Sequence, residues 1–227
     1  MPEQSSFGVE VSLVRAGQKV RNVLRGLVQR FGTEEIKRRL WNHEYRQGRW
    51  HCLDSMAGDC VYSHIEKHAK NGDILDLGCG PGVVGSELNV NAYHSYTGVD
   101  ICDVAIEKAT SRAAETRRTD KNGYLVSDIV SYLPNQLYDV ILFGDSIYYF
   151  SHQRIAEILD RYFKYLKPNG VFLVRTWVTT PRVRTIVRNI ERSFEVVEKR
   201  LYHQDRIVVI AFRPASQLVS TERPGDK

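Results

Sequence analysis

The stretch Ile74–Gly82 reads ILDLGCGPG and decides the fold. An apolar run ends in an acid, three glycines follow at alternate positions, and VVGSEL continues from Val83. Such a sequence is typical of a buried parallel strand, a tight turn and the start of a helix. Glycine adopts positive φ and has no Cβ, so the backbone of this turn can lie directly against a ligand at the carboxyl end of the strand.

The spacing of the glycines separates two kinds of nucleotide site. The dinucleotide fingerprint is G-x-G-x-x-G, whereas this turn is D-x-G-x-G-x-G, with Asp76 two residues before the first glycine. A glycine-rich turn alone is a weak signal, because any strand-to-helix turn uses glycine. The whole pattern resembles that of the class I S-adenosylmethionine-dependent methyltransferases. Within this family, the segments Leu40–Trp50 and Asp145–Tyr149 look most like small bacterial members of unassigned substrate. The resemblance covers about residues 40–213.

Two further acids follow short apolar segments in step with this turn. Asp100 ends the segment YTGVD, 24 residues after Asp76, and Asp128 ends YLVSD. A carboxylate at the tip of the second strand can accept hydrogen bonds from both ribose hydroxyls of a nucleoside. The resemblance implies that Asp128 lies near the adenine amino group. Each acid alone could equally be a strand-end or helix-cap residue, but three in register with the turn favour a methyltransferase.

The resemblance implies that S-adenosylmethionine is the cofactor and S-adenosylhomocysteine the product. It assigns cofactor binding to Asp76, Gly78, Cys79, Gly80, Gly82, Asp100, Ile101, Asp128 and Ile129, and, before the core, to Tyr45, Arg49 and Trp50. In the family, the segment that precedes the core commonly forms a lid over the methionine half of the cofactor and the acceptor. The alternative for its aromatic residues is a packed helix face.

Strands and helices alternate along the chain, which predicts a Rossmann-like, doubly wound α/β sheet of seven strands. We expect strands at 73–77, 96–99, 123–127, 139–144, 171–177, 195–202 and 206–213, and helices at 82–89, 103–116, 152–166 and 181–192. Lys167–Gly170 (KPNG) predicts a turn before the fifth strand. Only a short polar turn at Gln204–Asp205 joins the last two strands, so a C-terminal antiparallel hairpin should end a mostly parallel sheet.

Length and composition fit one domain with extensions, since 227 residues are enough for a sheet covered by helices on both faces. We expect a basic amphipathic extension over residues 1–32, a helical lid region over 33–70, the methyltransferase core over 71–213 and a flexible tail over 214–227. Within the lid region, Thr33 should cap a helix that begins with Glu34 and Glu35.

Cysteine usage and hydropathy limit the class of protein. The four cysteines show no C-x-x-C spacing and no histidines at metal-ligand intervals, so neither a metal site nor a disulfide framework is expected. This cysteine usage makes a reducing cytoplasm the simplest setting. There is no run of about 18 apolar residues and no signal-peptide pattern, so we expect a protein that is soluble or attached only at a surface. Basic and aromatic groups alternate over Leu40–Trp50 only, so nucleic-acid binding is not expected. The sequence leaves the oligomeric state open.

Residues 11–31 carry five basic side chains and no acid. On a helical wheel the apolar side chains of this segment fall within an arc of about 140°, and the basic side chains fall on the other side. Such a helix can lie on an anionic membrane surface, which would make the protein peripheral at the inner membrane. The favoured alternative is that the helix packs on the core or on a partner subunit with a solvated basic face.

Candidates for the transfer chemistry follow the fourth expected strand, in the segment GDSIYYFSH. Asp145 lies at the carboxyl end of that strand, where it can hold the methionine ammonium or take a proton from the acceptor. The family often has a histidine four residues after this acid. Tyr149 stands there instead, which leaves the identity of the base open. His152 is displaced from the pattern and is either catalytic or a cap for the next helix.

These motifs specify the cofactor and say little about the acceptor. The Asn/Asp-Pro-Pro-Tyr/Phe tetrad of enzymes that methylate bases or glutamine is absent, because Gly144–Ile147 occupies its place. We expect methyl transfer to oxygen or nitrogen of a small molecule, with a sugar, a glycolipid or a secondary metabolite as candidates. The alternative is a regulatory or assembly protein that binds S-adenosylmethionine without turnover.

Overall fold

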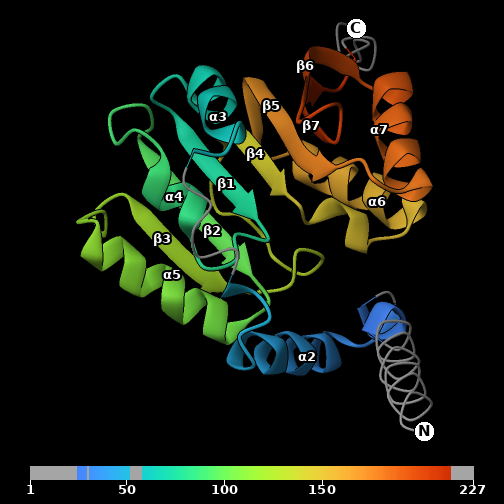
Figure 1. Cartoon of the computed structure of the whole chain (residues 1–227). Helices are drawn as coiled ribbons and strands as arrows, with labels where there is room; N and C mark the ends of the chain where they lie inside the picture. The colour runs from blue at the N-terminus through green and yellow to red at the C-terminus, as the bar shows by residue number, and fades with distance from the viewer. Residues whose placement is uncertain (1–24, 30, 52–57, 216–227) are drawn as a thin grey trace, which may run out of the picture.

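The computed structural model describes residues 25–29, 31–51 and 58–215, and within them seven strands form one sheet in the order β3-β2-β1-β4-β5-β7-β6 (Figure 1). The strands are β1 Asp73–Leu77, β2 Ser95–Asp100, β3 Asn122–Val126, β4 Tyr138–Gly144, β5 Leu166–Trp177, β6 Glu195–Tyr202 and β7 Ile207–Arg213. Strands β1 to β5 pair in parallel, whereas β7 pairs antiparallel with both β5 and β6. The predicted fold class, terminal hairpin included, is confirmed.

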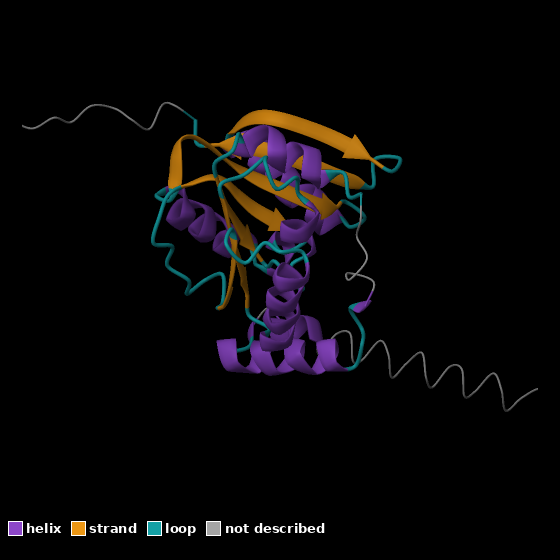
Figure 2. Cartoon of the chain, turned by 90° about the vertical axis from the view of Figure 1, so that its left-hand side faces the viewer, coloured by secondary structure: helices purple, strands orange, loops and turns teal. Residues whose placement is uncertain are grey.

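Helices cover both faces of this sheet and one of its ends. They are α2 Glu34–Arg46, α3 Val61–Ala69, α4 Val83–Glu87, α5 Asp103–Glu115, α6 His152–Phe163 and α7 Pro181–Ser193, with a 3-10 helix, η2, at Ile147–Tyr149. Helix α2 lies across the end toward which β1 and β2 point (Figures 1 and 2). Thr33 caps it, since its hydroxyl accepts a hydrogen bond from Ile36 N at 3.4 Å. No helix in the described part of the chain is long and apolar enough to cross a membrane.

The core forms because apolar side chains of the central strands alternate between the two faces. Ile141 and Phe143 of β4 belong to the cluster that α6 and α7 cover. Val140 and Leu142 belong to the cluster on the other face, which α3 covers. All four side chains are fully buried, and burial of each such side chain contributes about 1.5–3 kcal/mol. The sheet is therefore covered on both sides, as in other doubly wound folds.

Strand β5 begins earlier than the sequence predicts. The sequence predicts a turn at Lys167–Gly170 and a strand only after it, yet Leu166 already pairs with Tyr138 of β4. The pairing register then shifts across the turn residues, which bulge from the ladder because Pro168 has no N–H to donate. Helix α6 is correspondingly shorter than the predicted 152–166 and ends at Phe163.

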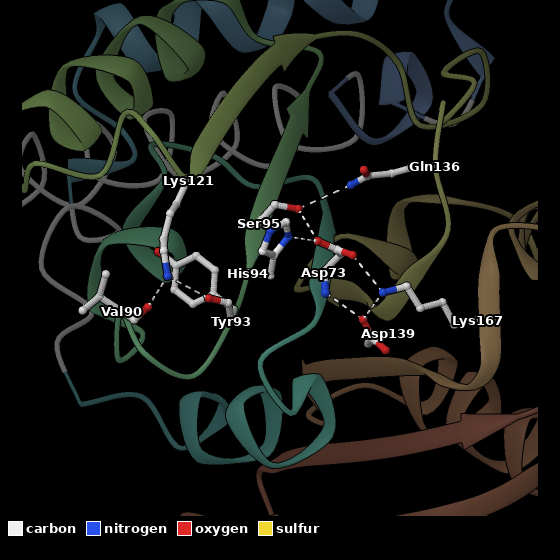
Figure 3. Close-up of polar contacts among 9 residues, drawn as sticks. All are labelled: Asp73, Val90, Tyr93, His94, Ser95, Lys121, Gln136, Asp139 and Lys167. Atoms are coloured by element: carbon white, nitrogen blue, oxygen red, sulfur yellow. Dashed lines mark hydrogen bonds and ion pairs between the residues drawn. The ribbon is translucent and has the colours of Figure 1, made fainter.

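Charged side chains tie together the amino ends of the parallel strands (Figure 3). Lys167 Nζ lies 2.8 Å from Asp73 Oδ2 and 2.7 Å from Asp139 Oδ2. Asp73 also accepts a hydrogen bond from Ser95 Oγ at 2.6 Å and lies 2.9 Å from His94 Nδ1. Burial alone would raise the pKa of Asp73, but the hydrogen bonds from Lys167, Ser95 and His94 hold it at about 2. The bulged residue Lys167 thus joins β5 to β1 and β4.

The edge strand β6 is fixed to α3 through Glu198. Its carboxylate lies 3.0 Å from both Lys67 Nζ and His68 Nε2 and 3.2 Å from His64 Nδ1. His64 Nε2 in turn lies 2.7 Å from Tyr202 Oη. Burial opposes ionisation of Glu198, but its hydrogen bonds with Lys67, His64 and His68 lower its pKa to about 2. The terminal hairpin is therefore anchored to the helical layer by polar contacts.

Replacing Lys167 with methionine should destabilise the protein by about 1–2 kcal/mol at pH 7, because Asp73 and Asp139 would lose their shared cation. The pKa of Asp73 is depressed from 3.8 to about 2, so its contribution is present above about pH 4 and is lost as the pH falls through 2. Urea unfolding should show a smaller difference between wild type and variant at pH 3 than at pH 7. The control is Lys164→Met at an exposed position, and an equal effect of the two substitutions would contradict the prediction.

Candidate active site

One cavity of about 380 Å³ opens at the carboxyl ends of β1, β2, β4 and β5, with α2 along one side. The predicted site residues that line it are Tyr45, Trp50, Asp76, Gly78, Cys79, Gly80, Asp100, Ile101, Asp128, Ile129, Asp145 and Tyr149. Three others, Gly82, Arg49 and His152, are not among its described lining residues. The fold therefore gathers most of the predicted residues around one space.

The glycines after β1 are required for different reasons. Gly78, Gly80 and Gly82 have φ of +89°, +53° and +72°, in the left-handed region that favours glycine. A Cβ on Gly78 would lie 2.6 Å from Ser146 Cβ, and one on Gly82 would lie 2.7 Å from a side chain of α5, so packing closes both positions. A Cβ on Gly80 would meet Tyr45 Oη at 3.2 Å. Gly80 is therefore the position at which the backbone is most open to a ligand.

Asp100 ends β2 beside this turn. Its Oδ2 accepts a hydrogen bond from Gly80 N and its Oδ1 accepts one from Cys102 N, both at 2.9 Å. Burial raises the pKa of Asp100, and the backbone hydrogen bonds offset only part of that rise. Each carboxylate oxygen has a second lone pair, so both can still accept from a ligand at the cavity wall. This arrangement fits the two hydroxyls of a ribose.

Asp76 is enclosed at the end of β1, with 1% of its surface exposed. Tyr96 Oη donates a hydrogen bond to its Oδ2, whereas Oδ1 is buried and has no hydrogen-bond partner among the described residues. Burial raises the pKa of Asp76 from 3.8 to about 7, and nearby Asp100 adds to the rise. Because buried oxygens are normally paired, this orphaned atom fits a cavity whose ligand supplies the missing donor.

Asp128 brings a third carboxylate to the cavity, after β3. Its Oδ1 accepts a hydrogen bond from Val130 N at 2.7 Å, and its Oδ2 lies 4.0 Å from Lys37 Nζ of α2. The side chain is buried, and Ile129 beside it also lines the cavity. A carboxylate here offers acceptors, as recognition of an adenine amino group would require.

Asp145 directly follows β4 and has a φ of +50°, which is uncommon for a residue other than glycine. Its Oδ2 accepts a hydrogen bond from Arg175 Nη1, and Arg175 Nη2 lies 2.7 Å from Asp59 Oδ2. Arg175 comes from β5 and is 4% exposed. Burial raises the pKa of Asp145, although the positive charge of Arg175 opposes the rise. The carboxylate predicted to act on the acceptor is thus tied to a buried cation.

Aromatic side chains from α2 and the turn after it cover the cavity. The Trp41 ring lies 5.3 Å from that of Trp50 and 5.4 Å from that of Tyr149, between centroids. The Arg25 guanidinium lies 5.4 Å and 5.1 Å from the centroids of the two indoles, and its Nε is 2.6 Å from Glu44 Oε1. Glu44 also accepts a hydrogen bond from Trp50 Nε1 at 3.1 Å. A residue of the predicted N-terminal extension therefore packs against the predicted lid.

The three predicted residues that do not line the cavity lie elsewhere in the structure. Arg49 Nη1 lies 3.6 Å from Glu44 Oε1. His152 begins α6 with an exposed side chain, and the cap of this helix is Ser151. Gly82 precedes α4 and packs on α5. Roles for these three in cofactor binding or catalysis stay predictions without a contact to the cavity.

Several lining residues near Asp145 were missed by the sequence analysis. They are Asp59, Tyr62, Arg175 and Trp177. Arg175 and Trp177 could have been predicted from the sequence. They end the apolar run of a strand whose carboxyl end must lie beside that of β4. Asp59 had no such signal, since it lies 116 residues from Arg175 in the sequence and precedes a helix for which no bounds were predicted.

Asp76→Asn should flatten the pH dependence of stability. The pKa of Asp76 is raised to about 7 in the folded protein, so the fold keeps a proton that the unfolded chain releases near pH 4. The free energy of unfolding should fall as the pH rises from about 4 to 7, by at most about 4 kcal/mol. Asparagine cannot ionise, so urea unfolding at pH 5 and pH 8 should show a smaller loss for the variant. Asp160→Asn, on the exposed face of α6, should behave as wild type, and equal losses in wild type and Asp76→Asn would exclude this assignment.

A family model described as a methyltransferase domain matches residues 20–206. The chain is 26% identical over 147 residues to a ubiquinone biosynthesis O-methyltransferase of Rickettsia akari, covering 63% of this chain and 57% of that protein. It is 27% identical over 147 residues to a phosphoethanolamine N-methyltransferase of Plasmodium falciparum, covering 63% and 51%. The chain thus spans between half and three fifths of the length of these curated relatives.

Solved structures agree with the family in their fold. The 1,6-didemethyltoxoflavin-N1-methyltransferase of Burkholderia thailandensis, solved with 1,6-didemethyltoxoflavin and S-adenosylhomocysteine, has a TM-score of 0.66 at 14% identity, covering 79% of this chain and 87% of that one. The N-methyltransferase NodS of Bradyrhizobium japonicum WM9, in complex with S-adenosylhomocysteine, has a TM-score of 0.56 at 19% identity, covering 67% and 85%. Because the family model matches most of its length, the chain belongs to the class I S-adenosylmethionine-dependent methyltransferases.

Proposed function

We propose that this protein transfers the methyl group of S-adenosylmethionine to an oxygen or nitrogen atom of a small molecule. The observation that carries the proposal is that two sets of residues share one cavity. Asp76, Gly80 and Asp100 line it on the side of β1 and β2, and Asp145 and Tyr149 line it after β4. A methyl donor and an acceptor bound there would be neighbours, and such proximity is a large part of what catalysis of methyl transfer requires.

The cofactor side would hold its ligand through acceptor atoms and an open backbone. Asp100 has lone pairs for two ribose hydroxyls, and Gly80 lets the main chain approach the amino-acid half. Asp128 would accept a hydrogen bond from the adenine amino group. Asp76 Oδ1, which has no hydrogen-bond partner among the described residues, would accept one from the ligand. When bound, S-adenosylmethionine supplies a methyl group on a sulfonium sulfur, already activated for transfer.

The acceptor side would be oriented by Asp145 and Tyr149 and shielded by the aromatic cover. Burial raises the pKa of Tyr149, so its hydroxyl stays protonated at neutral pH and can both donate and accept. Trp41 and Trp50 would exclude water from the transfer. The names of the curated relatives include both an O- and an N-methyltransferase, and a sugar, a glycolipid or a secondary metabolite remains a candidate acceptor.

Attachment to an anionic membrane through residues 11–31 stays a prediction, since residues 11–24 and 30 lie outside the described residues. In the part that is described, Arg25 packs against the lid, whereas Leu27 and Phe31 are 50% and 72% exposed. The contact between Arg25 and Glu44 supports packing of this segment on the protein. A cytoplasmic location is part of the proposal and rests on the sequence.

Asp100→Ala should weaken binding of S-adenosylmethionine about 10- to 150-fold, which corresponds to roughly 1.5–3 kcal/mol for hydrogen bonds to a charged group. Isothermal titration calorimetry measures the affinity. Thermal unfolding should accompany it, because Asp100 also holds Gly80 N. Asp120→Ala, in an exposed turn, is the control. An unchanged affinity in a folded Asp100→Ala variant would rule out the ribose contact.

Tyr149→Phe keeps the ring that packs on Trp41 and removes only the hydroxyl. If the hydroxyl touches the acceptor, turnover should fall at least about tenfold while cofactor affinity stays nearly unchanged. Release of S-adenosylhomocysteine from labelled S-adenosylmethionine, over a panel of sugars, phenols and amines, measures turnover. Unaltered turnover would make Tyr149 a wall of the pocket. Cofactor binding without release on any acceptor would favour the non-catalytic alternative.

A further inference from the structure

The lining of the cavity contains more carboxyl groups than cations. Among the described lining residues the carboxyl groups are Asp59, Asp76, Asp100, Asp128 and Asp145, and the cations are Lys37 and Arg175. Both cations already have carboxylate neighbours, since Lys37 lies 4.0 Å from Asp128 and Arg175 lies between Asp59 and Asp145. Even with Asp76 protonated, the other four carboxylates outnumber the two cations by two. S-adenosylmethionine has one carboxylate, one ammonium and one sulfonium, so its single net positive charge does not balance this excess.

Part of the excess lies at the end of β4, where two carboxylates share one guanidinium. Arg175 is buried between Asp59 and Asp145, whose side chains are 8% and 27% exposed. Asp59 also accepts a hydrogen bond from Val61 N at 2.9 Å. By contrast, Asp145 Oδ1 has no hydrogen-bond partner among the described residues, and neither has Asp76 Oδ1 on the other side of the cavity. Asp145 therefore combines a share of the unbalanced charge with a carboxylate oxygen that has no partner, on a side chain that is 27% exposed.

Aromatic rings line the cavity around this carboxylate. Tyr148 and Tyr149 follow it on η2, with ring centroids 4.7 Å apart. Trp177, at the end of β5, has the Arg175 guanidinium 5.4 Å from its ring centroid and is 43% exposed. All three rings line the cavity. The Trp177 ring is also stacked on His203, so it serves as a wall of the cavity. Ring faces attract cations, so the two tyrosine rings beside an unbalanced carboxylate form an environment suited to an ammonium group.

We propose that the methyl acceptor is an amine that enters the cavity as its ammonium form and is held by Asp145. The inference rests on the proposed methyl transfer and restricts the acceptor atom to nitrogen. An anionic acceptor would be repelled by the excess of carboxylates. A neutral alcohol could donate one hydrogen bond but would leave the buried negative charge unbalanced.

Transfer to nitrogen requires the free amine, and Asp145 can provide it. The ammonium gives one proton to the Asp145 carboxylate, which exposes the nitrogen lone pair. That lone pair forms the new bond to the methyl carbon while the bond from this carbon to sulfur breaks, with its electron pair left on sulfur. The product nitrogen then has the positive charge that sulfur lost, and the proton on Asp145 passes to water. Burial raises the pKa of Asp145, in the direction that favours proton uptake.

Pairs of compounds that differ only in an amine and a hydroxyl test the proposal. Suitable pairs are tryptamine with tryptophol, 2-phenylethylamine with 2-phenylethanol, and glucosamine with glucose. Calorimetry at pH 7 measures the binding of each compound, without cofactor and with S-adenosylhomocysteine. The proteins are wild type, Asp145→Asn and the control Asp160→Asn. A parallel assay follows methyl transfer from labelled S-adenosylmethionine to the same compounds.

At least one amine should bind wild type and Asp160→Asn about tenfold more tightly than its hydroxyl partner, and Asp145→Asn should remove that preference. Methyl transfer to these compounds should go to nitrogen. The proposal is overturned if no amine binds wild type better than its partner, a comparison that holds even if Asp145→Asn fails to fold. It is also overturned if the preference survives in Asp145→Asn.

The same experiment tests the amine acceptor and the proposed methyl-transfer function separately. Methyl transfer to a hydroxyl group, with no preference for amines, would overturn the proposal that the acceptor is an amine. It would still support the proposed methyl transfer. Failure of the protein to bind S-adenosylmethionine would remove the proposed function. The binding comparison made without cofactor would then still decide whether the cavity selects an ammonium group.

Discussion

The candidate site depends on the position of β1 in the sheet. The chain runs outward from β1 through β2 to β3 and then crosses to the other side of β1 for β4 and β5. The turns that follow β1 and β4 therefore leave in opposite directions and open a crevice between them at the carboxyl edge. Gly80 and Asp145 reach this crevice because each follows closely after one of these two strands. Helix α2, the end of β5 and the segment after β3 add further walls.

Local sequence patterns were sufficient for the elements that form the base of this crevice. The bounds of β1 are those predicted, because an apolar run ends abruptly at a glycine turn. Asp76, Asp100 and Asp128 lie at or just beyond strand ends, and parallel strands bring their carboxyl ends to one edge. Position along the chain therefore translates into position in space. No such rule predicts which glycine faces a ligand. Only the neighbouring atoms in the structure show that Gly78 is packed against Ser146 and that Gly80 is open to the cavity.

Contacts between residues far apart in the sequence determine the features that local sequence patterns did not predict. The KPNG segment has the chemistry of a turn, yet the start of β5 depends on whether Leu166 finds Tyr138, and that is a property of β4. The guanidinium of Arg175 contacts Asp59, which lies 116 residues away in the sequence. A charged residue in an apolar strand indicates that it has a partner but does not identify that partner. Part of the wall around Asp145 was therefore out of reach of local patterns, although the strand that carries Arg175 was predicted.

The terminal hairpin leaves β6 as an edge strand, which bears on how the protein behaves at high concentration. An exposed edge offers unpaired N–H and C=O groups to other chains and so promotes aggregation. Val197 and Leu201 are 42% and 47% exposed on this strand. The pairing register of β6 shifts between Val196 and Glu198, and the charged run Glu198–Arg200 follows. A bent, charged edge is a poor template, so the hairpin that completes the sheet also discourages strand addition from neighbouring copies.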